Sequence, residues 1–175
     1  MPEYQILYRK NEQDRLLKWW RALDGNRGER AQLRRAESAD DVLLTVAFAR
    51  FLKIVDRSEA YQLFDNAMLA GLLSRVEKDD DSHSFAEALA KPKAGGSKAA
   101  MSELRFRQLQ KSQDVDEFFR RMTRAIALLG GTVNVLSLAD GILHWLKEHR
   151  QSVDQNPQKR LAVRWASDYY SNLKD

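Results

Sequence analysis

The residues best suited to chemistry in this sequence are arginines. Residues 25–35 contain two glycines, one acidic residue and four arginines, which are Arg27, Arg30, Arg34 and Arg35. A helix that begins near Arg27 places Arg27, Arg30 and Arg34 on one face, because they are three and four residues apart. A guanidinium group binds two phosphate oxygens at once and stays charged at neutral pH. The stretch therefore predicts a phosphate-binding surface.

Other residues in and beside this stretch bear on that prediction. Gly28 allows a backbone to approach closely and leaves the N–H groups of the first helical turn free for an anion. Asp24 and Glu29, however, are close enough in sequence to pair with the arginines. That pairing would make the segment an ordinary salt-bridged surface helix, and the spacing alone leaves both interpretations open.

A second basic region runs from residue 91 to residue 124, with nine basic residues against four acidic ones. Its candidates for nucleic-acid binding are Lys91, Lys93, Lys98, Arg105, Arg107, Arg120, Arg121 and Arg124. Arg120 and Arg124 are one helical turn apart, whereas Arg105 and Arg107 cannot share a helix face. Such a basic track suffices for binding that ignores sequence. The alternative is a solvated surface, in which Arg121 pairs with Glu117.

Catalytic and metal-binding patterns are weak by comparison. The three histidines are His83, His144 and His149, and no HExxH motif joins them. The run Asp79–Asp81 lacks the glycine and the terminal glutamate of a calcium loop, so it reads as a solvated acidic loop. Phosphate-binding glycine loops and the GxSxG serine motif are missing from the sequence. We therefore expect no catalytic residue, no metal and no cofactor, and we expect His144 to serve packing or to lie at the surface.

The composition indicates a helical, well-packed protein. The chain has 175 residues, of which 43% are hydrophobic and 31% charged, and it contains no cysteine. Helix-forming residues dominate, which predicts an all-α fold. The net charge is +4, but residues 37–81 carry ten acids against five bases, so the positive charge is concentrated in the two basic regions. We expect neither a signal peptide nor a membrane span, and hence a cytoplasmic location.

The apolar periodicity predicts a series of helices. The expected helices cover about residues 4–23, 28–36, 38–55, 59–77, 115–129, 135–150 and 154–173, with short helices around 85–89 and 103–109. Expected N-caps are Ser38, Ser58, Ser102, Asp114 and Asn134. Gly130 and Gly131 should end the helix before them. The third helix is apolar nearly all round and is therefore the expected centre of the core, whereas Tyr61 is assigned to the buried face of the fourth.

The Lys- and Gly-rich segment 91–101 is the best candidate for a boundary between lobes. It predicts two small helical bundles, an N-terminal lobe of residues 1–90 and a C-terminal lobe of residues 102–175, joined by this basic linker. No internal repeat is visible beyond the alternation of helices and turns.

Two other functions compete with binding to the nucleic-acid backbone. The short basic helix after a glycine turn is compatible with a helix-turn-helix transcriptional regulator, which would read base edges. Apart from Gln32, however, no asparagine, glutamine or serine is interleaved with the arginines of the basic helix, so backbone contact fits better. A protein-binding adaptor whose basic face meets an acidic partner is the third possibility.

Two sets of motifs together resemble CasB, the small subunit of the type I-E CRISPR surveillance complex called Cascade. The first is Leu17-Lys-Trp-Trp-Arg-Ala-Leu23 followed by Gly28-Glu-Arg-Ala-Gln-Leu-Arg-Arg35. The second is Arg105-Phe-Arg-Gln-Leu109, then Phe118-Phe-Arg-Arg121, then Val135-Leu-Ser-Leu-Ala-Asp140 continuing to His144-Trp145. Their order and spacing agree with the family over roughly residues 14–146, whereas nothing distinctive matches beyond about Pro157.

This resemblance implies a non-catalytic, two-lobed helical subunit. Two copies would lie head to tail in the complex and contact the large subunit and the backbone subunits that carry the guide RNA. Their basic surface would bind the phosphate backbone of guide RNA, target DNA and the displaced strand, and would thereby stabilise the R-loop in antiviral defence. Guide pairing supplies the sequence recognition, so such a subunit needs only backbone contacts.

Overall fold

A computed structural model describes residues 4–57 and 62–174 of the chain, and it confirms the all-α fold. Ser58 and Tyr61, for which we predicted a cap and a core position, lie outside these residues. The helices are α1 (Lys10–Ala22), α2 (Arg27–Arg34), α3 (Ala39–Leu43), α4 (Val46–Val55), α5 (Leu63–Leu73), α6 (Phe85–Ala90), α7 (Glu103–Gln110), α8 (Val115–Leu128), α9 (Val135–Arg150) and α10 (Leu161–Asn172). Two short 3-10 helices, η1 (Leu23–Gly25) and η3 (Pro157–Lys159), and two short strands, β1 (Lys78–Asp79) and β2 (Thr132–Val133), complete the described elements.

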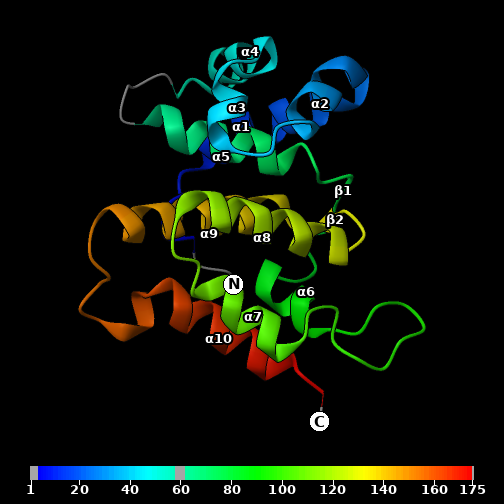
Figure 1. The fold of residues 1–175 in the computed structure, drawn as a ribbon, viewed down its shortest axis with the longest axis vertical. Coiled ribbons are helices and arrows are strands. Elements are labelled where there is room, and N and C mark those ends of the chain that lie inside the picture. The colour runs from blue at the N-terminus through cyan, green and yellow to red at the C-terminus, as the bar shows by residue number, and fades with distance from the viewer. Residues whose placement is uncertain (1–3, 58–61, 175) are drawn as a thin grey trace.

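The helices are stacked in three levels (Figure 1). Helices α1 to α4 lie at one end with α5 beneath them, α8 and α9 cross the middle, and α6, α7 and α10 form the other end. Helix α5 packs against both α3 and α9, and α6 packs against α10. The buried apolar side chains of all three levels form one connected core.

Helix α5, rather than the segment after Ser38, is the centre of the core. Every residue from Asp65 to Leu73 is buried. Gly71 lies where α3 and α8 converge on α5, and a Cβ atom there would come within 2.9 Å of the Val42 side chain and 3.0 Å of Phe119. The neighbouring helices can therefore approach this closely only because residue 71 has no side chain.

The expected helix from Ser38 to Val55 is divided into α3 and α4. Thr45 accepts a hydrogen bond from the N–H of Phe48 and so begins a new helix at Val46. Around this break Leu44 and Val46 are 89% and 77% exposed. Our prediction that this segment forms the core centre was therefore wrong, because the local capping bond redirects the chain.

Three other helix ends differ from the prediction, the first because of a long-range contact and the second because of a local cap. Residues 5–7 form an irregular segment with a bend rather than a helix, because their N–H groups donate to Asp140. Helix α10 begins at Leu161 rather than near 154, because Asn156 starts a short 3-10 helix first. Helix α5 ends at Leu73, after which the chain turns into β1.

A small parallel sheet joins the first and middle levels. Lys78 pairs with Thr132 and Asp79 with Val133. Gly130 and Gly131 end α8 with φ angles of +65° and +76°, as their expected role as a helix stop requires. The carboxylate of Asp79 accepts a 3.0 Å hydrogen bond from the N–H of Val135. Asp79 is thus part of the fold rather than of a solvated acidic loop.

The segment 91–101 extends away from the helices (Figure 1). Helix α6, which precedes this segment, packs against α10 through Phe85 and Trp165, whose rings are 5.5 Å apart. The division into lobes at 91–101 stays a prediction. Because of this contact, α6 groups with the C-terminal helices rather than with the N-terminal ones.

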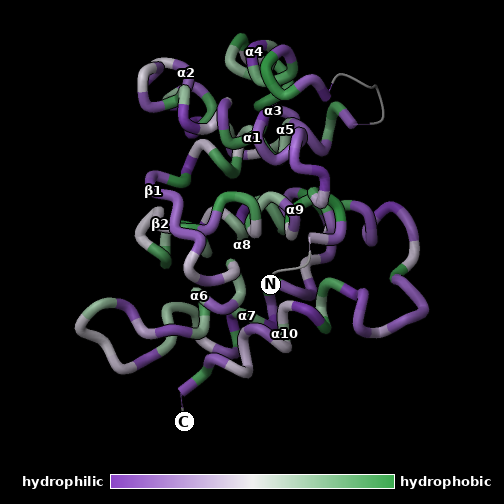
Figure 2. The backbone as a smooth tube through the Cα atoms, turned by 180° about the vertical axis from the view of Figure 1, so that it is seen from behind, coloured by the Kyte–Doolittle hydropathy of each residue, from purple (hydrophilic) through white to green (hydrophobic). Residues whose placement is uncertain are grey.

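The connection between α9 and α10 is hydrophilic along most of its length (Figure 2). Within the described residues, no helix is both long enough and apolar enough to cross a membrane.

Candidate nucleic-acid interface

Helix α2 forms where the sequence predicted it, but its arginines have different surroundings. Asn26 caps the helix by accepting from the N–H of Glu29, and Leu33 is fully buried. Arg30 donates to Asp24 at 3.0 Å and to the Val76 carbonyl at 3.4 Å. Arg30 therefore faces the rest of the protein instead of solvent.

Arg34 lies on the same inner side of α2. Its Nε donates to the Ser74 carbonyl at 2.9 Å, and its Nη2 pairs with Glu77 at 3.3 Å. Ser74 and Val76 follow the C-terminal end of α5, where backbone carbonyls lack helical partners and carry a partial negative charge. Arg30 and Arg34 thus satisfy the acceptors beyond a buried helix.

Arg75 completes this cluster from the opposite side. Its guanidinium donates to Gly71 at 2.5 Å, to the carbonyl of Arg34 at 3.0 Å and to that of Ala36 at 2.6 Å. Burial, reinforced by the nearby charge of Arg34, lowers the pKa of Arg75 to about 10, so the group still carries its charge at neutral pH. We call Arg30, Arg34 and Arg75 the internal arginine cluster.

Arg27 and Arg35 lie at the two ends of α2 and are exposed. Neither forms an ion pair with any described residue. The shared face expected for Arg27, Arg30 and Arg34 is therefore divided, with Arg27 toward solvent and the other two toward α5. Sequence reasoning missed Arg75, because a single arginine at a helix end gives no sign of what packs beside it.

Helices α7 and α8 carry the arginines of the second basic region. Ser102 and Asp114 cap these helices as predicted, by accepting from the N–H groups of Arg105 and Glu117. Phe106 of α7 stacks on Tyr169 of α10 with ring centroids 4.0 Å apart. Phe118 of α8 stacks on Trp145 of α9 at 4.1 Å. These buried rings fix both helices and leave their polar sides outward.

Arg121 is the one predicted site residue of α8 with internal partners. It pairs with Glu117 at 2.6 Å, as the four-residue spacing suggested. It also donates to the carbonyl of Gln108, at the C-terminal end of α7, and is 3.5 Å from the hydroxyl of Ser112. Arg121 therefore connects α8 to α7.

The remaining arginines of these helices are exposed and unpaired. Within the part of the chain that the structure describes, no ion pair or hydrogen bond is made by the guanidinium groups of Arg105, Arg107, Arg120 and Arg124. We call this set the open arginine surface. In the segment before α7, Lys93 and Lys98 are also exposed, while Lys91 is partly buried, and none of the three has a described ionic partner.

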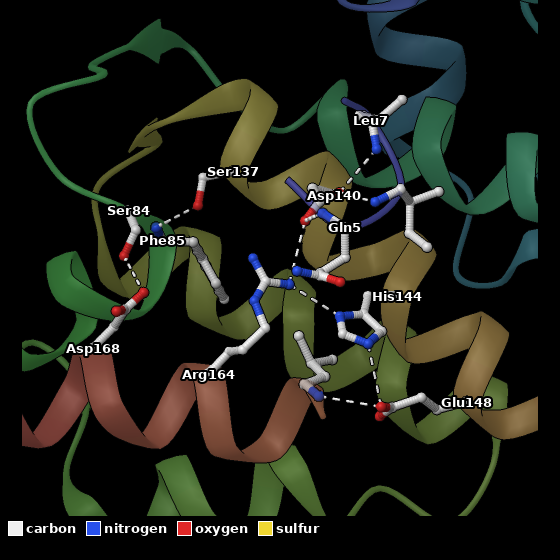
Figure 3. Close-up of polar contacts among 12 residues, drawn as sticks. Gln5, Leu7, Ser84, Phe85, Ser137, Asp140, His144, Glu148, Arg164 and Asp168 are labelled. Carbon is white, nitrogen blue, oxygen red and sulfur yellow. Dashed lines mark hydrogen bonds and ion pairs between the residues drawn. The ribbon is translucent and has the colours of Figure 1, made fainter. Parts of the chain in front are cut away.

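A separate polar network lies between α9, α10 and the N-terminal segment (Figure 3). Asp140, only 2% exposed, accepts from the N–H groups of Ile6 at 2.7 Å and Leu7 at 2.9 Å. Arg164 lies 3.5 Å from Asp140 and 3.0 Å from Nδ1 of His144. An aspartate among the mostly apolar residues of the first half of α9 is the sequence signal that could have indicated this network.

His144 continues the network to Glu148. Its Nε2 is 3.2 Å from Glu148, which also accepts from the N–H of Leu161 at the start of α10. Because Arg164 can only donate, Nδ1 of His144 accepts and Nε2 carries the proton. Burial lowers the pKa of His144, Glu148 opposes this shift, and Arg164 adds to it. His144 is thus a buried structural residue, and among the described residues no group of acids and histidines is arranged to hold a metal.

Comparison with known proteins identifies the family. The family described as CRISPR-associated protein Cse2 matches residues 29–170. No curated protein and no solved structure matches the chain significantly. The match extends past Pro157, where the sequence motifs indicated nothing, and it leaves the tryptophan helix around Trp19 outside. The chain belongs to the Cse2 family and is therefore a subunit of Cascade, as the resemblance to CasB indicated.

Proposed function

We propose that this Cse2 family member is a non-catalytic subunit that binds the nucleic-acid backbone within Cascade and stabilises the R-loop in antiviral defence. Its ligands are the phosphates of guide RNA and target DNA, including the displaced strand. Its protein partners are the large subunit, the backbone subunits and a second copy of itself, and it acts in the cytoplasm. The observation that carries the proposal is the set of four exposed, unpaired arginines on α7 and α8.

The contacts of each arginine decide which of the twelve predicted residues belong to this interface. When an exposed guanidinium without a partner binds a phosphate, it displaces counterions that were condensed on the nucleic acid. The release of these counterions drives binding. An arginine that already donates to buried carbonyls would have to leave acceptors unsatisfied before it could bind a phosphate. We therefore assign the main contacts to the open arginine surface, with Arg27, Arg35 and the exposed lysines 93 and 98 as further contacts.

A small number of contacts is enough for this function. The guide–target duplex formed in an R-loop is about as stable as the DNA duplex that it replaces. Backbone contacts to the strands can therefore shift the balance toward the open loop. They need no base specificity, because the guide supplies it.

Reversal of charge on the open surface tests the proposal. In the variant R105E/R120E/R124E we expect the affinity for single-stranded DNA at low salt to fall at least about tenfold, because phosphate attraction becomes repulsion. Fluorescence anisotropy measures the affinity, and the lifetime of the R-loop in reconstituted Cascade measures the consequence. The matched control is R21E/K53E/K159E, which reverses three exposed charges outside the interface.

The outcomes separate the proposal from its rivals. An equal loss in both triple variants would show that net charge alone matters and would contradict the assigned surface. Strong preference for one duplex sequence would favour the transcriptional regulator. Against that reading, the side chain of Gln32 accepts from the N–H of Ala47 at 3.1 Å and so faces α4 rather than a groove of DNA. Failure to bind any nucleic acid at about 50 mM salt would favour the protein-binding adaptor.

A further inference from the structure

A groove separates α7 from α8 on the side that carries the open arginine surface. Its volume is about 460 Å³. The lining residues are Met101, Arg105, Gln108, Leu109, Arg121, Arg124, Ala127 and Leu128. This volume lies within the range of roughly 300–1,000 Å³ that is typical of sites for small organic groups.

The floor and the walls of the groove differ in character. Met101 and Leu109 are 3% and 1% exposed and, with Ala127 and Leu128, supply the apolar lining. Arg105 from α7 and Arg124 from α8 both line the groove, and both are exposed. The groove thus combines apolar carbon surface with two cationic planes.

Arg121 sets the shape of one part of the groove. Its bonds to Glu117 and to the Gln108 carbonyl hold its guanidinium in place between the helices. Arg105 and Arg124, in contrast, have no described anionic partner that would neutralise their charges. Two cations on either side of an apolar floor repel each other, so an occupant that brings negative charge would be attracted.

The occupant that fits this chemistry is a nucleotide with an unpaired base. A base has flat apolar faces that stack on a guanidinium plane, and its phosphates bind guanidinium forks. Bases of a paired duplex are not available for such insertion, whereas those of a single strand are. An acidic peptide would supply negative charge, but it would not supply an apolar ring to pack against the apolar lining of the groove.

We infer that the groove between α7 and α8 receives an unpaired base of a single nucleic-acid strand, while Arg105 and Arg124 bind the phosphates on either side of it. The inference rests on the proposed function, because it names the part of the strand that meets the same arginines. It adds a contact that depends on the base ring, independent of base identity, to contacts that depend on charge alone.

A comparison of intact and abasic strands tests the inference. The full chain is titrated with a short single-stranded DNA and with a strand of the same length in which every position is abasic, so that the phosphate charge is equal. We expect the intact strand to bind at least about fivefold more tightly, because packing of the base against the apolar lining of the groove adds to the phosphate contacts.

Filling the groove provides the second arm. Ala127 is exposed and lines the groove, so A127F occupies it without disturbing the core. We expect A127F to lower the affinity for the intact strand toward that of the abasic strand and to leave abasic binding unchanged. The matched control is A49F, at another exposed alanine, on α4, which should change neither affinity. Thermal unfolding verifies that both variants fold.

The possible results are distinguishable. Equal binding of intact and abasic strands by the wild-type chain overturns the inference but leaves the backbone-binding function in place. Loss of intact-strand affinity in A49F as large as in A127F also overturns it. If neither strand binds and an acidic peptide does, the inference and the proposed function fail together. Base preference of orders of magnitude would contradict a site that stacks on any ring.

Discussion

The arginines of α2 and those of α7 and α8 share a sequence pattern but have different surroundings. In both regions basic residues recur at helical spacing. In α2, Arg30 and Arg34 face the end of α5, where they donate to the carbonyls of Val76 and Ser74. In α7 and α8, most arginines have only solvent opposite them. Spacing therefore shows which residues share a helix side, and only the fold shows what that side meets.

The two regions accordingly differ in what their arginines contribute. The internal arginine cluster satisfies buried backbone acceptors and so contributes to stability. The open arginine surface leaves its donors available, and we propose that it contributes to binding. Substitutions should therefore affect stability in the first region and affinity in the second, and each prediction below tests that separation.

The largest effect on stability is expected for Arg75. In R75M the carbonyls of Arg34 and Ala36 lose the Arg75 donor, the carbonyl of Gly71 keeps only its bond from Ser74, and the guanidinium contact with the Phe119 ring is lost. We expect the free energy of unfolding to fall by about 3 kcal/mol, because unsatisfied buried acceptors are costly. Urea denaturation measures it, with R120M as the matched control. A loss below about 0.5 kcal/mol would contradict the structural role, since exposed positions change stability by no more than that.

A smaller effect is expected from the pH dependence of His144. Its folded-state pKa is lowered, so the unfolded chain binds a proton more readily as the pH falls through the usual histidine range. The free energy of unfolding should then decrease as the pH falls from about 7.5 to 5.5. This decrease should be larger in the wild-type chain than in H144Q. Glutamine can accept from Arg164 and donate to Glu148 without titrating at these pH values.

Asp168 affects the pH dependence of the free energy of unfolding in the opposite direction to His144. Burial raises the pKa of Asp168, although its hydrogen bond from Ser84 lowers it. The folded state thus binds this proton more readily, which favours folding as the pH falls toward the usual aspartate range. The comparison with H144Q isolates the histidine because Asp168 is present in both proteins. Identical pH profiles of the two would show that His144 does not contribute.

The sequence predicted those features that depend on neighbours along the chain. Ser102, Asp114 and Asn134 cap their helices as expected, because a cap acts within three residues. The all-α fold and the Cse2 family also followed from the sequence. The start of α1 could not be predicted in this way, because Asp140, 133 residues from Leu7 in the sequence, holds the preceding segment in a non-helical conformation.

The candidate site was predictable to a similar extent. Its residue types and its location on α7 and α8 could be expected from charge and spacing. Which arginines face inward could not, because that depends on the position of α5 relative to α2 and of Gln108 relative to Arg121. The groove between α7 and α8 was also invisible, since its two walls are set by contacts with Tyr169 and Trp145.

The central claim is the division between internal and open arginines, and the salt dependence of binding tests it most directly. The slope of log affinity against log salt counts the phosphates that a protein neutralises, at about 0.7 per contact for a single strand. The comparison is between R30A/R34A and R120A/R124A, each titrated with the same single strand. We predict that R120A/R124A lowers the slope by about 1.4, whereas R30A/R34A leaves it unchanged and lowers stability instead. A reduced slope in R30A/R34A with an unchanged slope in R120A/R124A would contradict the account.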